Sequence, residues 1–167
     1  MTIADLNALP PEKARDEFAR CCGASSWVKN LLARRPFVDK ASALAAADAA
    51  WAETSEKDWL EAFSHHPRIG GKDALRAKFA ATSAWARGEQ AKAAQADEAT
   101  LDALAQGNAD YEARFGFIFI VCATGKTAAE MLSLLKARLA NERASELAIA
   151  AVEQAKITKI RMEKLLT

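Results

Sequence analysis

Apolar and polar residues are interleaved along the chain in segments typical of successive helices. One continuous apolar run, "FIFIV" at 117–121, stands apart from them. Alanine is abundant, and only seven glycines and four prolines oppose helix formation. The run has strand character, but a lone strand lacks a partner for its backbone hydrogen bonds. We therefore expect 117–121 to be a buried extended or helical segment that passes through a helical core.

Capping and breaking residues mark where the helices begin and end. The predicted helices span 10–22, 27–35, 40–51, 56–65, 72–95 (with Gly88 as a candidate break), 97–115, 128–139 and 142–166. The signals at their ends are Pro10, Pro11 and Gly23, Ser26 and Pro36, Asp39, the capping-box pairs Ser55–Asp58 and Thr127–Glu130, and Gly116. The fold class predicted from these segments is all-α.

We expect a single-domain multi-helix bundle of about seven to nine helices over residues 1–167, without a regular up-and-down order. A chain of 167 residues is long enough to bury a core of its own. The sequence contains no internal repeat, no low-complexity linker and no sign of a second domain.

Charge and composition narrow the class of partner. The 23 basic and 22 acidic residues give a formal net charge of +1, which provides no long-range field to gather nucleic acid or anionic lipid. We therefore expect no nucleic-acid partner and no membrane partner. The N-terminus lacks a basic region followed by an apolar run, and no apolar stretch reaches membrane-spanning length. A cytoplasmic location is expected.

The three cysteines, Cys21, Cys22 and Cys122, form no CxxC pair. Adjacent Cys21 and Cys22 are poorly placed to bridge each other, so we interpret all three as reduced thiols that act mainly as small apolar residues. Two adjacent histidines without a thiol pair do not make a structural zinc site, and no metal is expected.

"CATGKT" at 122–127 invites comparison with a phosphate-binding loop. Such a loop needs a glycine five residues before the Gly-Lys pair, and that position is Ile120. We interpret the segment as a helix N-terminus in which Gly125 makes a turn and Thr127 is the cap. A nucleotide-hydrolysing function is therefore not expected.

Both histidines of the chain lie side by side in "SHHPRIGG" at 64–71. Pro67 disfavours the α conformation at His66, so the preceding helix should end at about His65. His66 then leaves the helix on a stiff segment, and the two glycines that follow let the chain approach a ligand closely. This pattern suits a binding site, but it is equally that of a helix C-terminus with surface histidines.

Two further positions carry candidate chemistry. In "RGEQ" at 87–90, Glu89 could set the tautomer and pKa of an imidazole and Gln90 could recognise an amide-like edge, although such a pair is usually a solvated face. In the last helix, Ile157, Arg161 and Leu165 lie four apart on one stripe. An arginine between apolar residues either extends to water or binds an anion such as a carboxylate.

Together, "HPRIGG", "RGEQA", "FGFIFIVCATGK" and "KITKIRMEKL" resemble 2-oxo-4-hydroxy-4-carboxy-5-ureidoimidazoline (OHCU) decarboxylase, in the family's order and over nearly the whole chain. The resemblance implies an all-helical fold, often a homodimer. It implies a small-molecule substrate, a ureidoimidazoline that loses CO2 in the last step of urate conversion to (S)-allantoin. It also implies that the reaction uses no cofactor.

The resemblance assigns roles residue by residue. The catalytic residues would be His66 and its partner carboxylate Glu89, whereas His65 is not carried over. The substrate-binding residues would be Pro67, Gln90, Phe119, Ile120, Val121 and Arg161, of which Phe119, Ile120 and Val121 act through their backbone. Many members have a serine three residues before the glutamate, and this chain has Ala86 there, so one substrate hydrogen bond is in doubt.

The competing hypothesis is a non-catalytic helical module that binds a ureide or a protein partner. Such a module explains the composition equally well. It does not explain why the His-Pro, Glu-Gln and late Arg motifs occur in one chain.

Overall fold

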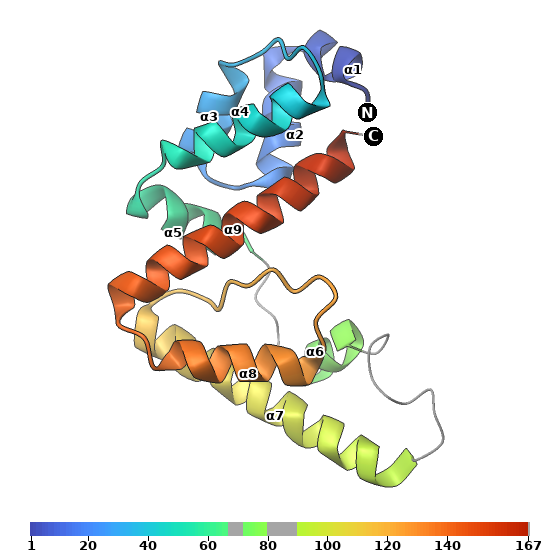
Figure 1. The fold of residues 1–167 in the computed structure, drawn as a ribbon, viewed down its shortest axis with the longest axis vertical. Coiled ribbons are helices and arrows are strands. Elements are labelled where there is room, and N and C mark those ends of the chain that lie inside the picture. Colours follow the sequence, from blue (N-terminus) through green and yellow to red (C-terminus); the bar gives the residue numbers. More distant parts are fainter. Residues whose placement is uncertain (67–71, 80–89, 167) are drawn as a thin grey trace. The chain divides into compact units, whose positions relative to one another are not determined.

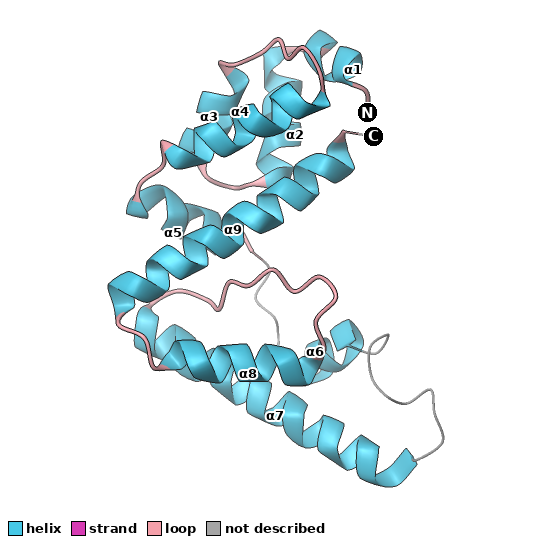
Figure 2. Ribbon diagram, in the orientation of Figure 1, coloured by secondary structure: helices cyan, strands magenta, loops and turns pink. Residues whose placement is uncertain are grey.

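The structure is a computed structural model of the chain, and it describes residues 1–66, 72–79 and 90–166. Over these ranges the fold is all-helical, with nine helices and no strand, which confirms the predicted class (Figures 1 and 2). The helices are α1 (Ile3–Ala8), α2 (Pro11–Cys21), α3 (Ser25–Leu32), α4 (Lys40–Ala52), α5 (Glu56–Ser64), α6 (Lys72–Phe79), α7 (Gln90–Phe115), α8 (Ala128–Leu139) and α9 (Arg143–Leu165).

Several predicted helix ends are confirmed by their caps. Asp39 opens α4 and Thr127 opens α8 as N-caps whose side chains accept backbone N–H groups, and Ser55 forms the predicted capping box with Asp58. Gly116, which follows α7, has a φ of 79°, a value that glycine adopts without strain. The sequence signals of capping were therefore sufficient at these ends.

Other boundaries differ from the prediction. α1 was missed, although Thr2 and Asp5 form a capping box at its start. Ser26 does not cap α3, because the helix already begins at Ser25 and the Ser26 hydroxyl donates instead to Asp58 on α5. The break expected at Gly88 lies outside the described residues, and α7 begins at Gln90 rather than near 97.

The chain divides into two compact units. Unit 1 comprises Met1–His66, Ile120–Cys122 and Leu147–Thr167, and unit 2 comprises Pro67–Phe119 and Ala123–Glu146. The single domain over 1–167 stays a prediction.

Unit 1 has an aromatic core between α2, α3 and α4. Phe18 on α2 packs edge-on against Trp27 on α3 with ring centroids 6.4 Å apart, and both side chains are fully buried. The Trp27 indole donates to the carbonyl oxygen of Ala47 on α4, at 3.0 Å. Three helices are thereby fixed around one side chain.

α9, the long helix in red and orange in Figure 1, is joined to the rest of unit 1 by hydrogen bonds along much of its length. From its middle to its C-terminal end the bonds join Glu153 to Cys122, Gln154 to His66, Arg161 to Cys21, the Glu163 carbonyl to Lys40 and the Leu165 carbonyl to the Met1 amino group. Since a helix is a rigid rod, these bonds fix segments far apart in sequence at defined heights along α9.

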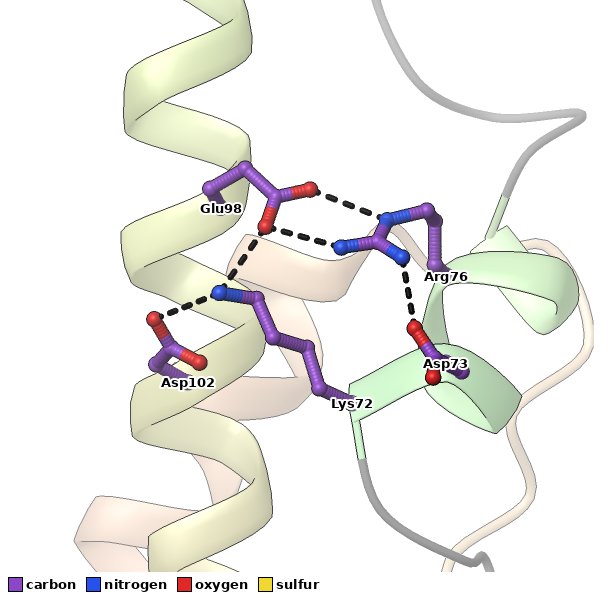
Figure 3. Close-up of polar contacts among 5 residues, drawn as sticks. All are labelled: Lys72, Asp73, Arg76, Glu98 and Asp102. Carbon is purple, nitrogen blue, oxygen red and sulfur yellow. Dashed lines mark hydrogen bonds and ion pairs between the residues drawn. The ribbon is translucent and has the colours of Figure 1, made fainter.

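In unit 2, α7 packs along α8, and an exposed ionic cluster joins α6 to α7 (Figure 3). Glu98 on α7 accepts two bonds from Arg76 at 3.0 Å and lies 2.9 Å from Lys72 Nζ. The Arg76 and Lys72 hydrogen bonds lower the pKa of Glu98 to about 2. Asp73 and Asp102 complete the alternation of charge along the cluster. α6 is thereby held against α7 by charge pairs that salt will screen.

The apolar run 117–121 forms neither helix nor strand, and Phe117, Phe119 and Ile120 are buried. This confirms the expected buried segment. In unit 2, the rings of Phe117 and Phe119 pack edge-on against Tyr111 with centroids 5.8 and 5.1 Å away.

A buried polar network supports those rings. Glu146 is fully buried and accepts from Arg138 Nε at 2.7 Å, from Asn141 Nδ2 at 2.8 Å and from the Tyr111 hydroxyl. The Arg138 guanidinium also lies 4.7 Å from the centroid of the Phe119 ring. Removing one partner would leave a buried charge without compensation.

We therefore expect Glu146→Gln to lower the free energy of unfolding by about 3–5 kcal/mol, the usual cost of breaking a buried ion pair. Glu142→Gln makes the same chemical change at an exposed position immediately before α9 and should cost less than about 0.5 kcal/mol. Urea denaturation of both variants checks this. Equal small effects would contradict the assigned role of the network.

Candidate functional site

His66 follows the end of α5 on a backbone that is held in place. α5 ends at Ser64 with His65 as its C-cap, which confirms the predicted helix end. The backbone N–H of His66 donates to the carbonyl oxygen of Phe63 at 3.1 Å. The imidazole is partly buried, and its Nε2 lies 2.6 Å from Gln154 Oε1 on α9. His66 is therefore not a freely rotating surface histidine.

Gln154 continues this contact into the core of unit 1. Its side chain is fully buried, and its Nε2 donates to Thr158 Oγ1, one turn further along α9, at 3.1 Å. Thr158 also acts on the fully buried Cys22, where it lowers the pKa of the thiol against the larger, opposite effect of burial. Polar contacts thus link the imidazole to Thr158 on α9.

Arg161 lies on α9 two turns after Gln154. Its Nη1 donates to the carbonyl oxygen of Cys21, the last residue of α2, at 3.1 Å. A cation at a helix C-terminus is favourable because unpaired carbonyl groups and the helix dipole make that end negative. The sequence did not predict this bond. The two alternatives that it left open for Arg161 were extension to water and binding of an anion.

The electrostatics around His66 favour a neutral ring. Burial lowers the pKa of His66, and the positive charge of Arg161 lowers it further, while the hydrogen bond to Gln154 opposes both. The thiols beside it are also neutral, because burial raises the pKa of Cys21 to about 11 and raises that of Cys22. The described part of the site therefore combines a neutral imidazole with a permanent cation.

His65 has a different environment. It is exposed and lies over Gly23 in the connection between α2 and α3. A Cβ on Gly23 would overlap the His65 side chain, so glycine is needed there for close approach. The contacts of His65 are those of a packing residue.

Cys122, which follows the apolar run 117–121, binds α9 at Glu153, next to Gln154. The backbone N–H of Cys122 donates to the Glu153 carboxylate at 2.7 Å, and Lys156 lies 2.5 Å from the same carboxylate. Ile120 and Val121 immediately precede this bond, in unit 1, whereas Phe119 belongs to unit 2. Neighbouring residues of α9 thus hold His66 and the strip 120–122.

The structure brings only part of the predicted site together. His66, Arg161, Ile120 and Val121 lie in unit 1. Pro67, Glu89 and the family serine position, Ala86, lie outside the described residues, and for Gln90 only its place at the start of α7 is described.

The sequence reasoning missed Glu153, Gln154 and Thr158. It followed the stripe Ile157–Arg161–Leu165, whereas the buried face of α9 carries Gln154, Thr158 and Met162 at the same spacing of four. Two polar residues on the face that also holds Ala150 and Met162 were the available signal, because buried polar groups need partners.

The thiols are free, as expected. Among the residues that the structure describes, no group of three or more His, Cys, Asp or Glu side chains could hold a metal ion. Nor, within the same ranges, does any helix have the length and apolar content to cross a membrane.

Comparisons with known proteins agree with the pattern of motifs. The family model described as OHCU decarboxylase matches residues 7–163. The chain is 42% identical over 157 residues to the uric acid degradation bifunctional protein TTL of Arabidopsis thaliana, covering 92% of this chain and 48% of that protein. It is 37% identical over 106 residues to the 2-oxo-4-hydroxy-4-carboxy-5-ureidoimidazoline decarboxylase of Amia calva, covering 60% of this chain and 57% of that protein. The chain therefore spans about half the length of the curated relatives it matches.

Solved structures extend the likeness to the fold. A crystal structure of OHCU decarboxylase in the presence of (S)-allantoin has a TM-score of 0.68 and 39% identity, covering 90% of this chain and 96% of that one. A crystal structure of (S)-allantoin synthase has a TM-score of 0.70 at 18% identity, covering 99% of this chain and 54% of that one, which bears on the fold alone.

The electrostatics of the site predict a titration. By NMR, the pKa of His66 should lie below the ordinary histidine value of about 6.5. Arg161→Met should raise it, because a positive charge that opposes protonation is removed. Lys159→Met removes a charge from an exposed position of α9 and should leave it unchanged.

The lowered pKa of His66 also makes the free energy of unfolding depend on pH. A ring whose pKa is lowered by folding contributes stability above about pH 6.5 and loses it as the pH falls through the folded value, because the unfolded chain then binds more protons. A pKa for His66 at or above 6.5, or one that Arg161→Met does not move, would contradict this description of the site.

Proposed function

The chain belongs to the OHCU decarboxylase family, and we propose that it converts 2-oxo-4-hydroxy-4-carboxy-5-ureidoimidazoline to (S)-allantoin and CO2 in urate degradation. The observation that carries the proposal is His66: a partly buried imidazole, held by a buried amide and close enough to Arg161 for the cation to lower its pKa. A structural histidine at a helix end needs neither feature.

The proposed decarboxylation requires a group that transfers protons and a positive charge that binds the carboxylate. The substrate has a carboxylate and a hydroxyl on one ring carbon, next to a ring carbon in an imine. When the bond to CO2 breaks, its electron pair forms a double bond to the imine carbon, the imine nitrogen takes up a proton, and an enol-like intermediate remains. The hydroxyl then loses its proton as the carbonyl forms, and the ureido-bearing carbon gains a proton on one face. The substrate supplies its own electron sink, so no cofactor takes part in the proposed reaction.

His66 is the proposed general acid–base, since an imidazole that is neutral near pH 7 can accept a proton and return it. Arg161 supplies a fixed positive charge for the carboxylate or the developing negative charge. The other proposed participants are Glu89 as partner of His66, and Pro67, Gln90 and the backbone of Phe119, Ile120 and Val121 as substrate contacts.

At the level of the whole protein, we propose one domain over residues 1–167 that works as a cytoplasmic homodimer on a small-molecule substrate. The family resemblance supports the dimer. Sedimentation equilibrium measures the mass directly.

The test generates the unstable substrate in place from urate with uricase and hydroxyisourate hydrolase, and follows allantoin by circular dichroism. The wild-type chain should produce one enantiomer rapidly. His66→Ala should lower the rate by about 10²–10⁴, the usual contribution of general acid–base catalysis. His65→Ala is the matched control and should retain turnover, because His65 makes packing contacts instead.

A slow racemic signal that the wild-type chain leaves unchanged would overturn the enzyme function and favour the helical binding module. Turnover that survives His66→Ala but not His65→Ala would leave the reaction in place and overturn the residue assignment.

A further inference from the structure

The buried amide of Gln154 has its oxygen toward His66 and its nitrogen toward Thr158. Its Nε2 donates to Thr158 Oγ1, and an amide nitrogen can only donate. The Thr158 hydroxyl oxygen accepts this bond at 3.1 Å. Oε1 is therefore the atom that faces His66 Nε2, 2.6 Å away.

An amide oxygen only accepts hydrogen bonds, so the imidazole must carry a proton on Nε2. A neutral imidazole has one ring proton, which leaves the lone pair on Nδ1. The ring cannot adopt the other neutral tautomer, in which Nδ1 carries the proton and Nε2 the lone pair, unless the Gln154 amide turns.

We propose that Gln154 is a positioning residue that holds His66 in the Nε2–H tautomer, so that Nδ1 is the ring nitrogen that gains and loses a proton in the reaction and the one left for its proposed partner Glu89. The part about the reaction rests on the decarboxylase function proposed above, whereas the tautomer does not. Gln154 reaches the substrate only through His66 and is therefore not itself catalytic.

The surroundings make this control effective. Gln154 is fully buried, so water cannot replace either of its partners. The charged and titratable groups that act on His66 or on the two thiols are Arg161 on α9, Cys21 and Cys22 at the end of α2, Glu17 and Arg20 on α2, and Glu61 on α5. None of them hydrogen-bonds the imidazole, so among the described residues Gln154 is the one that selects the tautomer.

Long-range ¹H–¹⁵N NMR of the imidazole rings reads the tautomer directly. The chain has two histidines, so His65→Asn assigns both sets of signals. At pH 8 the wild-type protein should show His66 with the proton on Nε2 and an unprotonated Nδ1. A proton on Nδ1, or an equal mixture of tautomers, would overturn the proposal without any measurement of turnover.

Variants then test the cause. Gln154→Leu removes the acceptor, so both tautomers should become populated and kcat should fall by about 10²-fold, with a smaller change in KM. Gln154→Glu keeps an accepting oxygen and should preserve the Nε2–H tautomer. Its negative charge should raise the pKa of His66 and shift the acidic limb of the kcat profile to higher pH. Gln106→Leu, the same change on the exposed face of α7, should alter neither.

Thermal unfolding of each variant confirms that it is folded before its NMR spectrum is read. A folded Gln154→Leu protein with the wild-type tautomer and kcat would overturn the proposal. If the wild-type chain lacks turnover but shows the Nε2–H tautomer, the positioning of His66 stands and the proposed function fails.

Discussion

The hydrogen bond between Gln154 and His66 is the constraint on which the described site depends. A buried amide left without a partner costs about 1–3 kcal/mol, so Gln154 holds the imidazole as firmly as the imidazole holds Gln154. Because α9 is one rigid helix, the same bond fixes His66 relative to Arg161 and relative to the strip 120–122 that Glu153 binds. The geometry of the site is thus set by the spacing of residues along a single helix.

The buried polar groups differ between the two units, because those of unit 2 are charged and those around His66 in unit 1 are neutral. In unit 2, Glu146 and Arg138 carry full charges and are paired with each other and with Tyr111. Around His66 in unit 1 the buried groups are neutral: an amide, a hydroxyl, a thiol and an imidazole whose pKa is lowered. The charged network of unit 2 holds its members rigidly in place. A neutral network beside one cation leaves the imidazole able to take up and release a proton, which is what acid–base chemistry requires.

The sequence predicted the all-α class, the ends of α4, α5 and α8 and the buried run at 117–121, because caps and composition act locally. It did not predict roles for Gln154 and Thr158. The partner of Gln154 is His66, 88 residues away in sequence, and Thr158 acts through its bond to Gln154, one turn away. It did not predict the hydrogen bond from Arg161 to the Cys21 carbonyl, because nothing near position 161 in sequence indicates that the end of α2 lies beside it. His66 was found through its neighbour Pro67 and the family motif, whereas the physical basis of its role required the fold.

The central claim is that a small ureide binds where α9 presents His66. Titration of (S)-allantoin into ¹⁵N-labelled protein, followed through the two histidine rings, tests it most directly. The account predicts that the ring signals of His66 move with saturating ligand while those of His65 stay in place. Signals of His65 that move while those of His66 remain fixed, or no change in either ring at saturation, would contradict it.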